Sequence, residues 1–179
     1  MHATRRLLIS TAFVVQSLAL PVFAADVAAE LSTLAPGAVA WAQEFSAAAL
    51  RQGVPLTPAQ REIARRVGVA HPEEVRLLVV DSIPLPSEAR LRAAALKVGL
   101  SSDRAAGLTL GHAVIVRRGW EDDLRILSHE LRHVAQYEQA GGIAPFLATH
   151  LASLAQHGYH DSPYEVDARA HELEATTGE

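Results

Sequence analysis

One amphipathic segment, between Asp122 and Gly142, constrains the fold of this 179-residue chain more than any other stretch. Its apolar side chains recur three or four residues apart, as they do on one face of an α-helix, at Leu124, Leu127, Leu131, Val134 and Ala135. Asp122 or Asp123 can cap the start of such a helix, and the Gly141-Gly142 pair can end it. The segment therefore predicts a long helix with one face buried.

The middle of this segment reads His129-Glu130-Leu131-Arg132-His133. Residues four apart on a helix share a face, so both imidazoles can bind one ion, and Glu130 can reach a water bound to that ion. The chain has no cysteine and nine histidines, so a transition metal would have to be held by His, Asp or Glu. We therefore expect a zinc site with His129 and His133 as ligands. The alternative is that both are ordinary, partly buried histidines and that Glu130 is solvated.

A third zinc ligand is expected from a later helix. The metzincin arrangement is excluded, because Gln136 stands where that pattern needs a glycine. The other arrangement takes a carboxylate further on, and Glu165 stands 32 residues beyond His133. Two alternatives remain open. Ser162 and Glu165 can form a capping box, and Asp167 is a competing ligand, although two residues along a helix it faces away from Glu165.

The chain resembles the gluzincin-type HExxH metallopeptidases, and within them small bacterial HExxH domains of unknown function. The resemblance covers roughly residues 74–170 and rests on Gly107-Leu108-Thr109-Leu110-Gly111-His112, on Ser128-His129-Glu130-Leu131-Arg132-His133-Val134-Ala135-Gln136-Tyr137-Glu138, and on Pro163-Tyr164-Glu165-Val166-Asp167-Ala168. It implies that Glu165 is a metal ligand and that Ala168 is a small packing residue. Many gluzincins carry an Asp at the position of Arg169, so the partners that orient the two histidines are unassigned.

The motif and the resemblance both imply metal-assisted hydrolysis, with Glu130 as the general base that later passes its proton to the leaving amine. The negative oxygen formed in this reaction needs a hydrogen-bond donor. The stretch before the third ligand offers four candidates: Tyr159, His160, His157 and Tyr164. We favour Tyr159.

The remaining elements predict an α+β fold, mostly helical with a small β-sheet, and the resemblance implies that it is a zincin-like domain. The expected helices are 37–50, 57–68, 87–98, 144–156 and one that begins at 162–163, and the expected strands are 75–80 and 108–116. The stretch from Leu110 to Val116 precedes the active helix, as the substrate-pairing edge strand does in the resembling fold. His112 on this strand can face the substrate groove, but we interpret it as a structural residue. We expect the His171-Glu172 pair at the surface.

Residues 1–24 have the pattern of a signal peptide. Arg5 and Arg6 precede an apolar stretch, and Val22-Phe23-Ala24 supplies small side chains at the positions that a signal peptidase reads, with cleavage expected between Ala24 and Ala25. An uncleaved anchor is the alternative, but the apolar stretch is shorter than the roughly 20 residues that span a bilayer. We therefore expect a single domain over 25–179, periplasmic or secreted, without a stable membrane span.

The chain carries a net charge of −4 and no basic run, which excludes nucleic acid as a first-choice partner. Hydrophobic residues make up 49% of the sequence, enough for a buried core. The sequence thus predicts an exported zinc-dependent metallopeptidase acting on a peptide or protein substrate. The alternative is a non-catalytic, zinc-binding module of the cell envelope that binds peptides or proteins, and a metal-free helical interaction domain is a third possibility.

Overall fold

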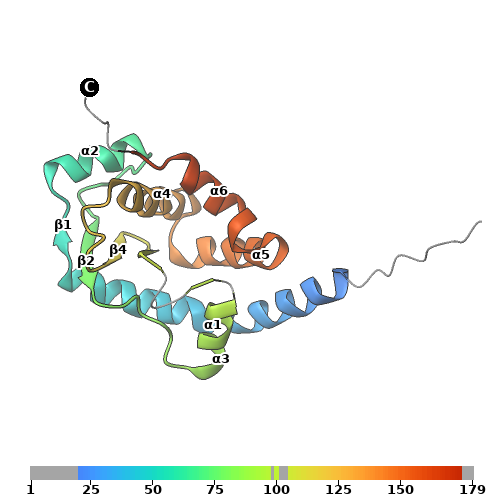
Figure 1. Cartoon of the computed structure of the whole chain (residues 1–179). Coiled ribbons are helices and arrows are strands. Elements are labelled where there is room, and N and C mark those ends of the chain that lie inside the picture. The colour runs from blue at the N-terminus through green and yellow to red at the C-terminus, as the bar shows by residue number, and fades with distance from the viewer. Residues whose placement is uncertain (1–19, 98, 101–104, 175–179) are drawn as a thin grey trace, which may run out of the picture.

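The computed structural model describes residues 20–97, 99–100 and 105–174, with side chains described from residue 33 onward. It confirms the α+β class. The helices are α1 (Leu20–Gln52), α2 (Pro58–Arg66), α3 (Ala89–Lys97), α4 (Leu124–Ala140), α5 (Ile143–Asp161) and α6 (Pro163–Ala170). The strands are β1 (Val54–Pro55), β2 (Arg76–Val80), β3 (Gly107–Leu110) and β4 (Ala113–Arg117), and Figure 1 shows their arrangement.

The four strands form one mixed sheet in the order β1-β2-β4-β3. The central pair, β2 and β4, is parallel, and the two outer pairings are antiparallel. The prediction of one strand over 108–116 is wrong, because Gly111 takes the positive φ of 65° and turns the chain into a β3–β4 hairpin. The edge strand beside α4 is therefore β3, and the expected edge segment 110–116 lies mainly in the central strand β4.

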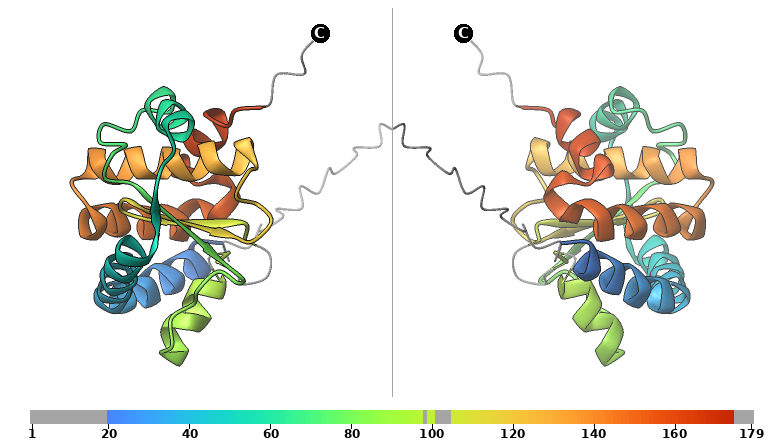
Figure 2. Two further views of the ribbon diagram at one scale, coloured as in Figure 1. Left: turned by 90° about the vertical axis from the view of Figure 1, so that its left-hand side faces the viewer. Right: turned by 90° about the vertical axis from the view of Figure 1, so that its right-hand side faces the viewer.

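The sheet is covered on both faces. Alternate side chains of β4 point to opposite sides, so Val114 and Val116 pack against α4 and α2, whereas Ala113 and Ile115 pack against α1. Figure 2 shows the sheet between these helical layers, with α4 on one side and α1 on the other. This packing fixes α4, and the HExxH residues on it, against the sheet.

Local sequence signals set several helix boundaries as predicted. Thr57 and Gln60 form a reciprocal capping box at the start of α2. Asp123 caps α4 by accepting a hydrogen bond from the Ile126 amide at 2.9 Å, and Gly141 ends that helix with a φ of 86°. Gly158, the expected stop of the penultimate helix, has the non-helical angles φ 72° and ψ 175°, so α5 consists of two helical segments joined at a kink.

Helix α1 is longer than predicted. The expected span was 37–50, but the helix runs from Leu20 to Gln52 and continues through Pro36. Of the predicted signal peptide, residues 1–19 lie outside the described part of the chain, and residues 20–24 form the first turns of α1. Among the helices of the described residues, none combines the length and apolar character needed to cross a bilayer.

Candidate metal centre

Three side chains from two helices meet at one point, as the sequence predicts. His129 and His133 lie one turn apart on α4, and Glu165 lies in the first turn of α6. One ligand atom from each of them lies within 4.8 Å of the other two. The Nε2 atoms of the two histidines are 3.2 Å apart, and they lie 3.4 and 3.5 Å from the two carboxylate oxygens of Glu165. This group could hold a metal ion.

The hydrogen bonds behind the imidazoles orient both rings toward that point. Nδ1 of His129 lies 3.0 Å from a carboxylate oxygen of Glu172, and Nδ1 of His133 lies 2.8 Å from the side-chain oxygen of Gln136. Each acceptor favours the tautomer with hydrogen on Nδ1, which leaves both Nε2 lone pairs facing each other. The Oε2 atom of Glu165 is buried and has no hydrogen-bond partner among the described residues. A cation bound at this point would contact both Nε2 lone pairs and the carboxylate oxygen that has no hydrogen-bond partner in the described chain. Zinc is commonly bound by nitrogen and oxygen ligands of this kind.

The charges at the centre stabilise one another. Burial alone would raise the pKa of Glu165, but the contact with the His129 imidazole, whose Nε2 atom lies 3.4 Å away, and the charges of the nearby histidines outweigh burial, and its pKa is lowered. Burial likewise would lower the pKa of His129, yet its contact with Glu165 and the charges of Glu130 and Glu165 outweigh it, and the pKa is raised. The centre therefore has strongly negative surroundings that favour a positive charge.

Glu130 lies beside the three-residue group with its carboxylate held against the edge strand. The side chain is buried, and its Oε2 atom accepts a hydrogen bond of 2.7 Å from the Thr109 hydroxyl on β3. Gly107 leaves the space that the carboxylate occupies, since a Cβ atom there would lie 2.5 Å from Glu130 Oε1. The sequence analysis gave no role to either residue, because no local pattern links β3 to a side chain 21 or more positions later.

His150 is a third histidine at this centre, and the sequence analysis missed it. Its Nε2 atom lies 3.9 Å from Glu165 Oε1, and its ring packs against both Phe146 and Tyr164. Burial, followed by the charge of His133, lowers its pKa to about 4, so the imidazole is neutral at neutral pH. No spacing rule pointed to it, because it lies on α5, outside both motif segments.

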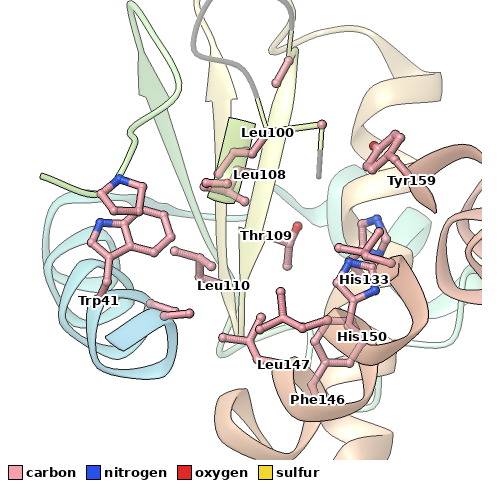
Figure 3. A pocket seen from close by; sticks show the side chains of 18 of the residues that line it. Trp41, Leu100, Leu108, Thr109, Leu110, His133, Phe146, Leu147, His150 and Tyr159 are labelled. Carbon is pink, nitrogen blue, oxygen red and sulfur yellow. The ribbon is translucent and has the colours of Figure 1, made fainter. Parts of the chain in front are cut away.

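The four candidate donors predicted before Glu165 differ in position. Tyr159 lines the cavity next to the centre, as Figure 3 shows, and is 48% exposed. Burial of its hydroxyl and the nearby charges of Glu165 and Glu130 raise its pKa, so it stays protonated. His157 and His160 are exposed, and the Tyr164 ring packs against Phe146. Tyr159 is thus the predicted candidate with access to the centre.

The two alternatives for the third ligand do not match the structure. The Ser162 side chain makes no capping hydrogen bond within the described chain, and its hydroxyl lies 3.0 Å from that of Ser153. Asp167 faces away and binds Arg132 through two hydrogen bonds of 2.7 and 3.0 Å. Glu165 is the carboxylate that joins the histidines.

Two other expectations are corrected or refined by the structure. Glu172 is not merely part of a surface pair with His171, because its side chain is only 19% exposed and supports His129. The residues that orient the two histidines, which could not be assigned from the sequence because Arg169 replaces the usual Asp, are therefore Glu172 and Gln136. His112 lies in the hairpin turn rather than in a strand, and its Nε2 atom binds Glu138 at 3.0 Å.

Searches find no matching family model, no matching curated protein and no matching solved structure for this chain. The fold and the site define an α+β protein with a His129-His133-Glu165 group that could hold a metal ion, in which Glu165 is buried and both histidines are partly buried.

Proposed function

We propose that this protein is an exported, zinc-dependent metallopeptidase that hydrolyses peptide or amide bonds. The observation that carries the proposal is the position of Glu130. This residue adds no atom to the three-ligand group, yet its buried carboxylate is held beside that group by Thr109. A structural zinc site has no need of such a carboxylate, whereas hydrolysis requires a base at this position.

The metal would be held by His129, His133 and Glu165. Zinc bound there would supply Lewis acidity, which polarises the scissile carbonyl and makes a water easier to deprotonate. Glu130 accepts the proton of the attacking water and delivers it to the leaving amine. Thr109 keeps the carboxylate of Glu130 turned toward the substrate while the proton moves.

Two groups are suited to stabilise the negative oxygen that develops on the substrate. The Tyr159 hydroxyl remains protonated because its pKa is raised, first by burial and then by nearby carboxylates. The neutral imidazole of His150 has a buried Nδ1 atom without a hydrogen-bond partner in the described chain. Both groups line the same cavity as Glu130 and Glu165. We assign the role to Tyr159, with His150 as the second donor.

The position of β3 supports a peptide or amide substrate. β3 is an edge strand of the sheet and contributes Gly107 and Thr109 to the lining of the cavity that Glu130 also lines. An extended substrate can add to this edge through main-chain hydrogen bonds, which would bring its carbonyl close to Glu130.

The decisive comparison is between hydrolysis and metal content in Glu130→Gln. We expect zinc binding to be unchanged and hydrolysis to fall at least 100-fold, the scale of general base catalysis. Glu174→Gln, at an exposed position beyond α6, is the matched control. Equal hydrolysis by both variants would refute the proposal, and zinc binding without hydrolysis in the wild type would favour the non-catalytic binding module. Export is tested separately, by N-terminal sequencing of the protein recovered outside the cytoplasm, with Ala25 as the expected first residue.

A further inference from the structure

A cavity of about 190 Å³ adjoins the metal centre and extends around the edge strand. Both faces of β3 line it. Gly107 and Thr109 line it on the side of Glu130, and Leu108 and Leu110 line it on the side of α1. In Figure 3, Trp41 lies on one side of these strand residues, and His133, His150 and Tyr159 lie on the other. The cavity is therefore continuous from the metal centre to the face of the sheet covered by α1.

The polarity of the lining changes along the cavity. Next to the metal centre the described side chains include Thr109, Glu130, His133, His150, Tyr159 and Glu165. The far end is formed by side chains from α1 and α3: Leu34, Ala38, Trp41, Ala42, Leu91, Ala94 and Ala95. Among these far-end side chains, the indole of Trp41 carries the one polar atom. A peptide main chain at the far end would lose its hydrogen bonds with water and find few side-chain partners in return.

The volume of the cavity indicates how large a group it can hold. A dry protein cavity of about 150 Å³ lined by apolar side chains binds benzene. A cavity of about 190 Å³ takes a larger group, and one that bends around β3 requires a flexible group rather than a rigid ring. An unbranched hydrocarbon chain has both properties.

Resting on the proposed hydrolase function, we propose that the substrate is an N-acyl amide whose hydrocarbon chain fills the far end of this cavity while its carbonyl lies at the metal centre. Hydrolysis breaks the amide C–N bond, adds the oxygen of water to the acyl carbon and transfers a proton to the leaving nitrogen. The products are a fatty acid and an amine. Specificity then depends on the small residues of α1 and α3, chiefly Ala38 and Ala95, because larger side chains there would shorten the cavity.

Binding is measured by calorimetry with the zinc-loaded full chain carrying Glu130→Gln, which keeps the ligand intact. N-decanoylglycine is compared with N-acetylglycine. Burying each methylene group contributes about 0.8 kcal/mol, or about fourfold in affinity. We expect the decanoyl compound to bind at least 100-fold more tightly, which corresponds to about four buried methylene groups. Equal affinities would overturn the proposal.

Paired variants test whether the hydrocarbon chain of the ligand lies in this cavity. Ala38→Phe, at a half-buried position in the lining, is expected to weaken decanoyl binding at least tenfold and to leave acetyl binding unchanged. Ala40→Phe, exposed on the same helix and outside the lining, is the matched control. If Ala38→Phe does not fold, Ala95→Phe against the exposed Ala93→Phe repeats the test on α3. Equal effects within a pair would overturn the assignment.

A third test compound shows whether the cavity binds an acyl chain or an amino-acid side chain. If N-acetyl-phenylalanine amide gains as much affinity from the cavity and loses it with Ala38→Phe, the occupant is a side chain and the acyl proposal is wrong. Hydrolysis by the wild type is measured separately. Decanoyl binding that depends on the cavity, without any hydrolysis, would support a cavity that binds hydrocarbon chains and refute the proposed hydrolase function. Hydrolysis without preference for acyl-chain length would support the hydrolase function and refute the acyl-chain cavity.

Discussion

The hydroxyl of Thr109 lies 2.7 Å from the carboxylate oxygen Oε2 of Glu130 and 3.0 Å from the carbonyl oxygen of the same residue. This single side chain connects the edge strand β3 to the helix that carries the HExxH motif. Thr109 and Glu130 are both buried, so water does not compete strongly for these hydrogen bonds. The contact fixes where the proposed base points.

We expect Thr109→Val to lower kcat/KM about 10- to 100-fold with zinc content unchanged. A hydrogen bond to a charged group is worth about 1.5–3 kcal/mol, and valine replaces the hydroxyl with a methyl group of similar size. Thr149→Val is the control, because its hydroxyl bonds only carbonyls of its own helix in the described chain. A variant as active as this control would show that Thr109 does not position the base.

Gly107→Ala should also reduce hydrolysis, by at least tenfold, while the metal is retained. The added Cβ atom would lie 2.5 Å from Glu130 Oε1, so the carboxylate has to move. Gly37→Ala is the comparison on α1, where the nearest atom to the added Cβ, in Leu91, is 3.9 Å away. Steady-state kinetics and elemental analysis of both variants make the test. Full activity in Gly107→Ala would mean that the base works from another position.

Zinc affinity should depend on Glu172, although this residue is not a ligand. Its carboxylate holds Nδ1 of His129 at 3.0 Å, and removing a partner of this kind typically costs 10- to 100-fold in metal affinity. Glu172→Ala is compared with Glu174→Ala, which is exposed. The dissociation constants come from competition with a chelator. Identical constants would contradict the proposed support of His129.

Stability in acid should depend on Glu138, which joins α4 to the loop before β2 and to the hairpin turn. Burial would raise its pKa, but hydrogen bonds from the Ala70 and His71 amides and from His112 outweigh burial and lower it. A carboxyl group whose folded pKa is below its unfolded value stabilises the fold above the unfolded value of about 4.5. That contribution is lost as the pH falls through the folded pKa.

Glu138→Gln should therefore reduce the free energy of unfolding by about 1–3 kcal/mol near pH 7 and flatten its fall between about pH 5 and pH 2. Glu62→Gln is the control, since this side chain is 67% exposed and its ion pair with Arg65 contributes little. Denaturant unfolding at several pH values gives both curves. Parallel curves for wild type and Glu138→Gln would refute the assignment.

The sequence predicted the elements whose signals are local. The capping box of Thr57, the Asp123 cap and the glycine stops at Gly141 and Gly158 need only a few neighbouring residues to act. The pairing of His129 and His133 followed from helical spacing. These predictions depend on backbone geometry that a short segment determines by itself. Glu165 is different, because it was expected from the zinc-peptidase arrangement and the resemblance rather than from any local signal.

The sequence did not predict features that depend on distant contacts. The hairpin at Gly111 lies between two short segments rich in apolar residues, 108–110 and 113–116, which the sequence analysis joined into one strand. Glu172 reaches His129 from 43 residues away and Thr109 reaches Glu130 from 21, and no local pattern marks such pairs. His150 joins the centre because α5 packs beside α4, which is a consequence of tertiary folding.

The most direct test of the central claim is elemental analysis of purified protein spanning residues 25–179, beside Glu165→Ala and Asp167→Ala. The account predicts one equivalent of zinc in the wild type, loss of zinc in Glu165→Ala and retention in Asp167→Ala, because Asp167 binds Arg132 instead of facing the histidines. Absence of zinc from the wild type after reconstitution, or full zinc in Glu165→Ala, would contradict it.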